Sequence, residues 1–225
     1  MTRVHLSPRA WVIAGALCAT AAAAQAQQVL LSEGFDSVSD LGAAGWVISN
    51  MSTPGGAVPE GWYQGSPDPT RFDAQAGFPT SFAASSFVTT AAGGTLSNWL
   101  VTPTFSTATA TQISFWVRGA NDPGFFDSFT YGVSSGSSDS AAFSLRPTSI
   151  APVGDWTQVT FGLSAQGAGA IGRLAIVYTG AADNSSLIGI DTLTVTAVPE
   201  PQTWLLTAAG LAACVAVVRR RKAAR

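Results

Sequence analysis

The sequence predicts an all-β protein, an antiparallel β-sandwich, held between two terminal segments of different character. Two observations predict it: short stretches in which apolar and polar residues alternate, and turn-rich breaks between those stretches. Helical periodicity is scarce over most of the 225 residues. The composition agrees, because 47% hydrophobic and only 11% charged residues suit a secreted β-protein better than a cytosolic enzyme.

The first 26 residues predict a signal peptide. Arg3 and Arg9 precede an apolar run over residues 10–23, and Ala24-Gln25-Ala26 has the small-x-small form of a cleavage site. The alternative is an uncleaved N-terminal anchor, but the apolar run is short and ends in this cleavage signal. We therefore expect an exported protein whose mature chain begins near Gln27.

Residues 27–198 read as one domain, because no internal repeat or long Gly/Ser linker divides them. Three of its stretches alternate clearly and predict strands with one buried face. The predicted inward residues are Ile113, Phe115 and Val117 in "QISFWVRG", Val159, Phe161 and Leu163 in "WTQVTFGLS", and Leu174, Ile176 and Tyr178 in "IGRLAIVYTG". Turn sequences such as "GAND", "SSGSSD" and "GAADNSS" separate the strands.

Most catalytic chemistry is excluded from this body by its composition. The only histidine, both cysteines and the only lysine are His5, Cys18, Cys214 and Lys222, which all lie in the terminal segments. Ser-His-Asp and Cys-His nucleophiles, zinc sites built on His or Cys, Schiff-base chemistry and disulfides are therefore ruled out there. Paired carboxylates remain, but among twelve of them some pair meets the spacing of a glycosidase by chance. We expect no enzyme.

The body is acidic. Four arginines against twelve carboxylates give residues 27–198 a net charge of −8. A nucleic acid or another acidic polymer binds proteins by releasing counterions to clustered Lys and Arg, and no such cluster exists in this part of the sequence. We predict no nucleic-acid partner.

Residues 199–225 combine three features: a Pro-Glu-Pro triplet, an apolar run over 204–218 and a basic tail over 219–225. The fifteen apolar residues would make a helix of about 22 Å, a marginal span for a hydrocarbon core of roughly 30 Å. The terminal cations would keep the tail in the cytoplasm. The residues that carry the pattern are Val198, Pro199, Glu200, Pro201, Arg219, Arg220, Arg221 and Lys222.

This arrangement resembles the PEP-CTERM sorting signal of exopolysaccharide-producing Gram-negative bacteria. The resemblance implies a helix held transiently in the inner membrane, removal of the tail by an exosortase, and release or transfer of the body to the cell surface or the extracellular space. The alternative is a permanent single-pass anchor.

The body resembles choice-of-anchor J domains through "GWYQGSPDPTRFDAQAG", "LSNWLVTP", "ISFWVRG", "FFDSFTYGVSS", "WTQVTFGLS" and "SSLIGIDTLTV", in this order. The resemblance implies a jelly-roll-like sandwich without enzymatic activity, in which the first and last strands lie side by side near a structural calcium. Its candidate ligands are Glu33, Asp36 and Asp191. The alternative is that Asp36 caps a turn and that Glu33 is solvated.

Two groups of residues are candidates for contact with a ligand such as a saccharide. The loop "GANDPGFFDSF" offers Asp122, Phe125, Phe126 and Asp127, and the aromatic side chains of Trp62, Tyr63 and Phe72 could form a stacking platform. The alternatives are an Asx-type turn and aromatic side chains that cover the core. Together the resemblances predict a non-enzymatic surface or biofilm-matrix protein whose partners are extracellular polysaccharide or cell-surface components. The alternative is a permanently anchored carbohydrate-binding adhesin.

Overall fold

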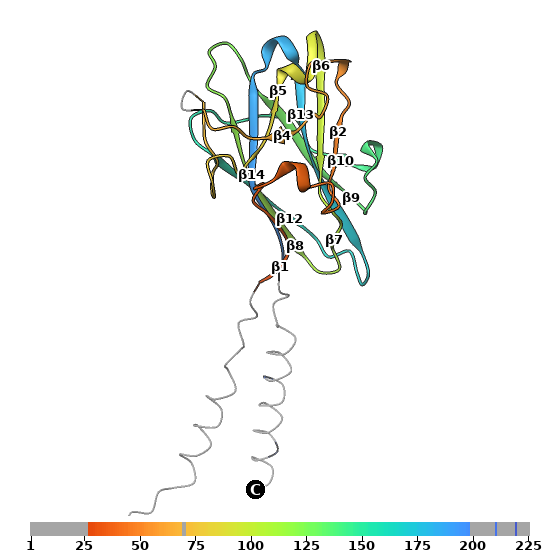
Figure 1. Ribbon diagram of the computed structural model, residues 1–225. Helices are drawn as coiled ribbons and strands as arrows, with labels where there is room; N and C mark the ends of the chain where they lie inside the picture. Colours follow the sequence, from red (N-terminus) through yellow and green to blue (C-terminus); the bar gives the residue numbers. More distant parts are fainter. Residues whose placement is uncertain (1–26, 69–70, 199–209, 211–218, 220–225) are drawn as a thin grey trace, which may run out of the picture.

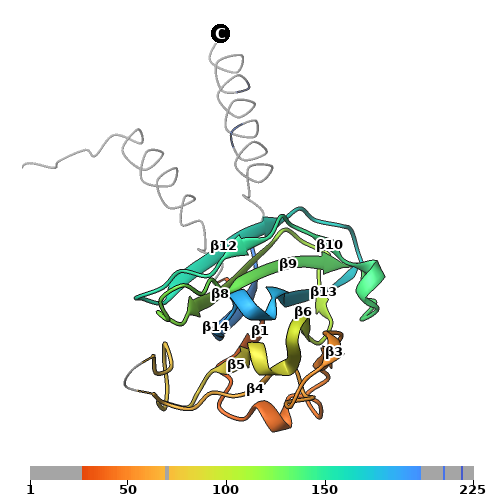
Figure 2. The ribbon, with the colours of Figure 1, turned by 90° about the horizontal axis from the view of Figure 1, so that it is seen from above.

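A computed structural model describes residues 27–68 and 71–198, together with Gly210 and Arg219. Residues 27–198 form two antiparallel sheets packed face to face (Figures 1 and 2), which confirms the predicted all-β sandwich. The predicted signal peptide and the predicted sorting signal, apart from Val198, Gly210 and Arg219, lie outside the described residues. Within the described part of the chain, no helix has the length and apolar character needed to cross a membrane.

The first sheet has six strands, ordered β12-β8-β14-β5-β4, with β1 also paired to β14. Their bounds are β1 (Gln28–Glu33), β4 (Tyr63–Gln64), β5 (Ala83–Ser86), β8 (Thr111–Gly119), β12 (Thr157–Leu163) and β14 (Leu187–Ala197). Every pairing in this sheet is antiparallel. The first and last strands of the body are therefore neighbours, as the resemblance to choice-of-anchor J domains implies.

The second sheet has eight strands, ordered β10-β9-β13-β6-β2, with β11 on β9, β3 on β6 and β7 on β13. Their bounds are β2 (Val47–Asn50), β3 (Thr53–Gly55), β6 (Thr90–Val101), β7 (Phe105–Ser106), β9 (Ser128–Ser134), β10 (Ser144–Leu145), β11 (Ser149–Ile150) and β13 (Ile171–Ala181). Within residues 27–68 and 71–198, four short 3-10 turns connect strands: η2 (Val38–Asp40), η3 (Phe87–Thr89), η4 (Ser140–Ala142) and η5 (Ala182–Asn184).

The core lies between the two sheets and follows the predicted alternation. Ile113, Phe115 and Val117 of β8 are buried, while the side chains between them are half-buried. The inward residues of β13 join the same cluster, and those of β12 pack against it at the sheet edge. Burying each large apolar side chain stabilises the fold by roughly 1.5–3 kcal/mol.

The outer face of β13 departs from simple alternation. Ala175 and Val177 are also buried, because Trp99 and Phe143 cover them from outside. Phe143 follows η4, so a segment that connects two strands folds back over the sheet. A strand whose two faces are both covered reads as a continuous apolar run, as "LAIVY" does.

β14 organises the first sheet. It pairs with β8 along one side, and along the other side it pairs with β5 near its start and with β1 near its end. The register shifts between Asp191 and Thr194, and Thr192 has a positive φ of 44°. As a whole, β14 runs from the end of the sandwich that carries η3 and η5, at the top of Figure 1, to the end that carries β1.

Candidate functional site

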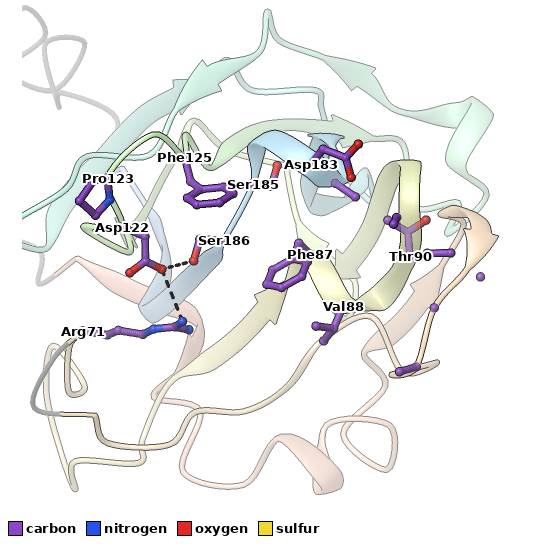
Figure 3. Close-up of a pocket in the computed structure, with 16 residues that line it drawn as sticks. Arg71, Phe87, Val88, Thr90, Asp122, Pro123, Phe125, Asp183, Ser185 and Ser186 are labelled. Carbon is purple, nitrogen blue, oxygen red and sulfur yellow. Dashed lines mark hydrogen bonds and ion pairs between the residues drawn. The ribbon is translucent and has the colours of Figure 1, made fainter.

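A groove of about 730 Å³ opens at the end of the sandwich that carries η3 and η5. Segments far apart in the sequence line it: the turn after β3, the loop at Arg71, η3 with the start of β6, the loop after β8, and η5 with the residues before β14. Figure 3 shows two phenylalanine rings between an ion pair at one end and Thr90 and Asp183 at the other. The side chains with aromatic, charged or hydroxyl groups in the lining include Arg71, Phe87, Asp122, Phe125, Asp183 and Ser186.

The two rings belong to Phe87 and Phe125, whose exposed fractions are 43% and 41%. Backbone hydrogen bonds hold both in place: the Phe87 amide donates to the Ser186 carbonyl at 3.0 Å, and the Phe125 amide donates to the Asp122 carbonyl at 3.1 Å. The chain is thus fixed while the rings stay accessible. An exposed aromatic on a fixed backbone offers a ligand apolar contact at a low entropic cost.

The polar end of the groove is built around Asp122. Its Oδ2 lies 3.4 Å from a terminal nitrogen of Arg71 and accepts a hydrogen bond from the Ser186 hydroxyl. Arg71 also approaches Asp68 at 3.9 Å. Arg118 of β8 donates to the Arg71 carbonyl at 3.2 Å, which ties this loop to the sheet. The guanidinium of Arg71 therefore sits between two carboxylates.

The opposite end of the groove is fixed by Asp183 in η5. Its Oδ1 accepts a hydrogen bond from the Gly93 amide at 2.8 Å, which links η5 to β6. The positive φ of 72° at Gly93 is a conformation that favours glycine. This end therefore presents a carboxylate that is held in place by the backbone of β6.

Asp127 lies below the groove, with only 2% of its surface exposed. Its Oδ1 accepts hydrogen bonds from the Tyr178 hydroxyl at 2.6 Å and the Ser186 amide at 2.8 Å, while Oδ2 is buried without a hydrogen-bond partner among the described residues. Burial raises the pKa of Asp127, and the Tyr178 hydroxyl and nearby amides partly offset this. Asp127 therefore positions Ser186 from beneath.

The other predicted contact residues are dispersed. Phe126 is exposed but does not line the groove within the described part of the chain. Trp62 and Tyr63 line a second cavity of about 750 Å³ next to β2 and β4. Trp62 is only 1% exposed, and its indole nitrogen donates to the Asn98 carbonyl at 3.0 Å. Of the predicted contacts, the structure brings Asp122 and Phe125 to one groove, whereas Trp62 and Phe72 are buried in the core.

Two of the three predicted calcium ligands, Asp36 and Asp191, hold one loop, residues 75–81. Asp191 is fully buried and accepts hydrogen bonds from the amides of Gln75 and Ala76 at 2.7 and 3.1 Å. Asp36 accepts one from the Ser81 hydroxyl at 2.6 Å. Glu33, at the end of β1, instead accepts one from the Phe35 amide at 2.8 Å.

These hydrogen bonds occupy carboxylate oxygens that a calcium ion would use. Within residues 27–68 and 71–198, no three Asp, Glu, His or Cys side chains gather closely enough to hold a metal ion. The arrangement fits a loop anchor, and calcium binding stays a prediction.

Sequence reasoning did not single out Arg71, Phe87, Asp183 or Ser186 as site residues. Arg71 carried a usable signal, since it is one of only four cations in the body. Phe87 carried none, because in "SSFVTT" it reads as one more apolar residue of a strand. The side chain of Phe87 is exposed because the residue lies in the 3-10 turn that connects β5 to β6.

No protein-family model matches the chain, and no curated protein matches it in sequence. Among solved structures, the chain is similar to the K3 cleaved adhesin domain of Lys-gingipain from Porphyromonas gingivalis W83, with a TM-score of 0.56 and 20% identity over 76% of this chain and 99% of that one. The K1 domain of the same protein gives a TM-score of 0.54 and 22% identity over 75% and 98%. At these identities the similarity shows a shared fold: the body has the sandwich architecture of cleaved adhesin domains.

Proposed function

We propose that the body is a non-enzymatic binding domain for surface or extracellular saccharides, and that the groove at η3 and η5 is its binding site. The observation that carries the proposal is the pair of exposed rings, Phe87 and Phe125, in a groove of about 730 Å³. The negative face of an aromatic ring attracts the weakly positive C–H groups on the face of a sugar ring. Ligand sites generally pair such apolar walls with a few fixed polar groups.

The polar groups of the groove suit hydroxyl recognition. Arg71 supplies donors, Asp122 and Asp183 supply acceptors, and Ser186 can serve as either. Asp122 and Asp183 already take part in contacts that hold their segments, so a ligand meets preorganised partners. We assign binding rather than hydrolysis, because both carboxylates of the groove serve the fold through Arg71 and the Gly93 amide.

Export and sorting extend this proposal. The predicted signal peptide and the resemblance to a PEP-CTERM tail support delivery to the cell surface by an exosortase, with a choice-of-anchor J body. The test is fractionation of the native host with antibodies against the body and against a tag after Arg225. The body should separate from the tag, and replacing Pro199-Glu200-Pro201 by alanines should keep them together. If body and tag stay together in the inner membrane with and without this change, a permanent anchor replaces the proposal.

The binding site is tested with the purified protein on an array of oligosaccharides, followed by calorimetry on those that bind. Phe87→Ala and Phe125→Ala should each weaken binding at least about tenfold, which corresponds to about 1.4 kcal/mol. Phe78→Ala is the matched control, because Phe78 is the most exposed phenylalanine at 76% and does not line the groove. Binding that survives both groove variants, or that is lost with Phe78, would place the site elsewhere.

A further inference from the structure

The charges around the groove decide which saccharides it can accept. An acidic saccharide carries carboxylate or sulfate groups, and proteins recognise these with Arg or Lys side chains that are free to pair with them. Residues 27–198 contain four arginines and no lysine or histidine. The question is therefore which of the four arginines a ligand could meet.

Three of the four arginines serve the fold. The Arg118 guanidinium lies 5.0 Å from the centre of the Phe72 ring, and that of Arg146 lies 4.9 Å from the centre of the Phe161 ring. Arg173 donates to backbone carbonyls, including that of Thr102 at 2.7 Å. Within residues 27–68 and 71–198, none of these three lines the groove.

Arg71 is the groove's one cation among the described residues, and it is already paired. Asp122 lies 3.4 Å from its guanidinium and Asp68 lies 3.9 Å away. Asp183 adds a second carboxylate to the lining, so Arg71, Asp122 and Asp183 together give the groove a net charge of −1. An acidic ligand would have to displace a carboxylate from Arg71 and approach Asp183 as well.

Resting on the proposed saccharide function, we infer that the groove selects uncharged saccharides and rejects acidic ones, and that the pairing of Arg71 with Asp122 sets this preference. The body's net charge of −8 acts in the same direction at longer range. Salt screens such long-range repulsion within a Debye length of about 8 Å at physiological ionic strength. The preference therefore depends mainly on the groove's own charges.

The experiment compares neutral oligosaccharides of glucose, galactose, mannose and xylose with oligosaccharides of galacturonate, glucuronate and mannuronate of matched length. Titration calorimetry on the full protein should give affinities for the neutral ligands at least about tenfold higher than for the acidic ones. The neutral affinities should change less than about twofold between about 50 mM and about 500 mM NaCl, because no ion pair forms on binding.

Asp122→Asn gives a gain-of-function test. The amide keeps the shape and still accepts a hydrogen bond from Ser186, but it removes a charge from beside Arg71. The ratio of acidic to neutral affinity should rise at least about tenfold. Asp68→Asn removes the other carboxylate beside Arg71 and should also raise the ratio of acidic to neutral affinity. This variant replaces Asp122→Asn in the test if Asp122→Asn does not fold. Asp139→Asn is the control: it makes the same charge change at the N-cap of η4, away from the groove.

The outcomes separate the two proposals. If acidic oligosaccharides bind the wild type as tightly as neutral ones, and Phe125→Ala weakens both, the groove binds saccharides and the inference about charge is wrong. It is also wrong if Asp139→Asn raises the ratio as much as Asp122→Asn does, since overall charge would then set the preference. If no oligosaccharide of either kind binds, the saccharide function itself is wrong.

Discussion

Asp191 and Asp127 are both buried aspartates of the sandwich, but their carboxylates are satisfied to different degrees. Asp191 uses both oxygens: Oδ2 accepts from the amides of Gln75 and Ala76, and Oδ1 accepts from the Thr192 amide at 2.5 Å and the Thr192 hydroxyl at 3.2 Å. Asp127 uses only Oδ1, and no described residue gives its Oδ2 a hydrogen bond.

A buried carboxylate can therefore have one oxygen or both oxygens hydrogen-bonded, so burial alone does not show how completely the group is paired. Burial raises the pKa of both carboxylates, and the hydrogen bonds only partly offset it. The two residues differ in what they hold. Asp191 ties a distant loop into the bulge of β14, where β5 has ended and β1 has not begun. Asp127 ties Ser186 to β13 below the groove.

The largest effect is expected at Asp191. Asp191→Ala removes the acceptor of the Gln75 and Ala76 amides and leaves a cavity at a fully buried position. The free energy of unfolding should fall by about 3 kcal/mol. Urea denaturation measures this. Asp36→Ala, at an exposed residue that holds the same loop through Ser81, should cost less than about 1 kcal/mol. Equal losses in the two variants would contradict the role of Asp191 as the main anchor of the loop.

Calcium offers a second test of the same region. If Glu33, Asp36 and Asp191 bind calcium in the folded state alone, the free energy of unfolding should rise by roughly 2.7 kcal/mol at a hundredfold excess over the dissociation constant. Asp191→Ala should abolish this rise, while Asp127→Asn should keep it. If the midpoint of thermal unfolding is the same in millimolar calcium and in chelator, Asp191 does not bind calcium and its role is to accept hydrogen bonds from the loop.

The smallest effect is a pH dependence at Asp127. Because its pKa is raised in the folded state, its contribution to stability is fully present below the unfolded pKa of about 3.9 and is lost as pH rises through the folded value. Asp127→Asn removes this loss and still offers an acceptor to Tyr178 and Ser186. Its unfolding free energy relative to the wild type should therefore increase with pH above about 4, by at most about 1.4 kcal/mol per pH unit. Denaturation series at several pH values, with Asp139→Asn as the exposed control, measure the slope. If the difference in unfolding free energy between Asp127→Asn and the wild type does not change with pH, burial does not destabilise the ionised Asp127 carboxylate.

The strands were predictable because their signal is local. Alternation over β8 and β12 states which face is buried without reference to any other segment, and both strands follow it. The continuous apolar run of β13 is less informative about which face is buried. The cover of its outer face comes from Phe143, which lies between η4 and β10 and so outside the local sequence pattern of β13. The aromatic Trp62 sits in a Gly- and Pro-rich loop, where burial has no periodic signal.

The site was only partly predictable because its parts meet through the tertiary fold. Asp122 and Phe125 could be singled out from one loop, but Arg71 and Phe87 join them from separate connections. The role of Asp191 was hidden for the same reason: its amide donors lie 115 and 116 residues earlier in the chain. A carboxylate in a strand next to the first strand reads equally well as a metal ligand or as a loop anchor.

The course of β14 has a mechanical consequence. The strand begins one residue after Ser186 of the groove and ends one residue before Val198, so its eleven residues span about 36 Å between the two. A pull on the chain beyond Val198 against a ligand held in the groove would draw β14 lengthwise between β8 on one side and β5 and β1 on the other. The ladder hydrogen bonds would then share the force in shear instead of opening one after another. The body would resist a force applied along β14 at Val198 far better than a peeling force across its edge.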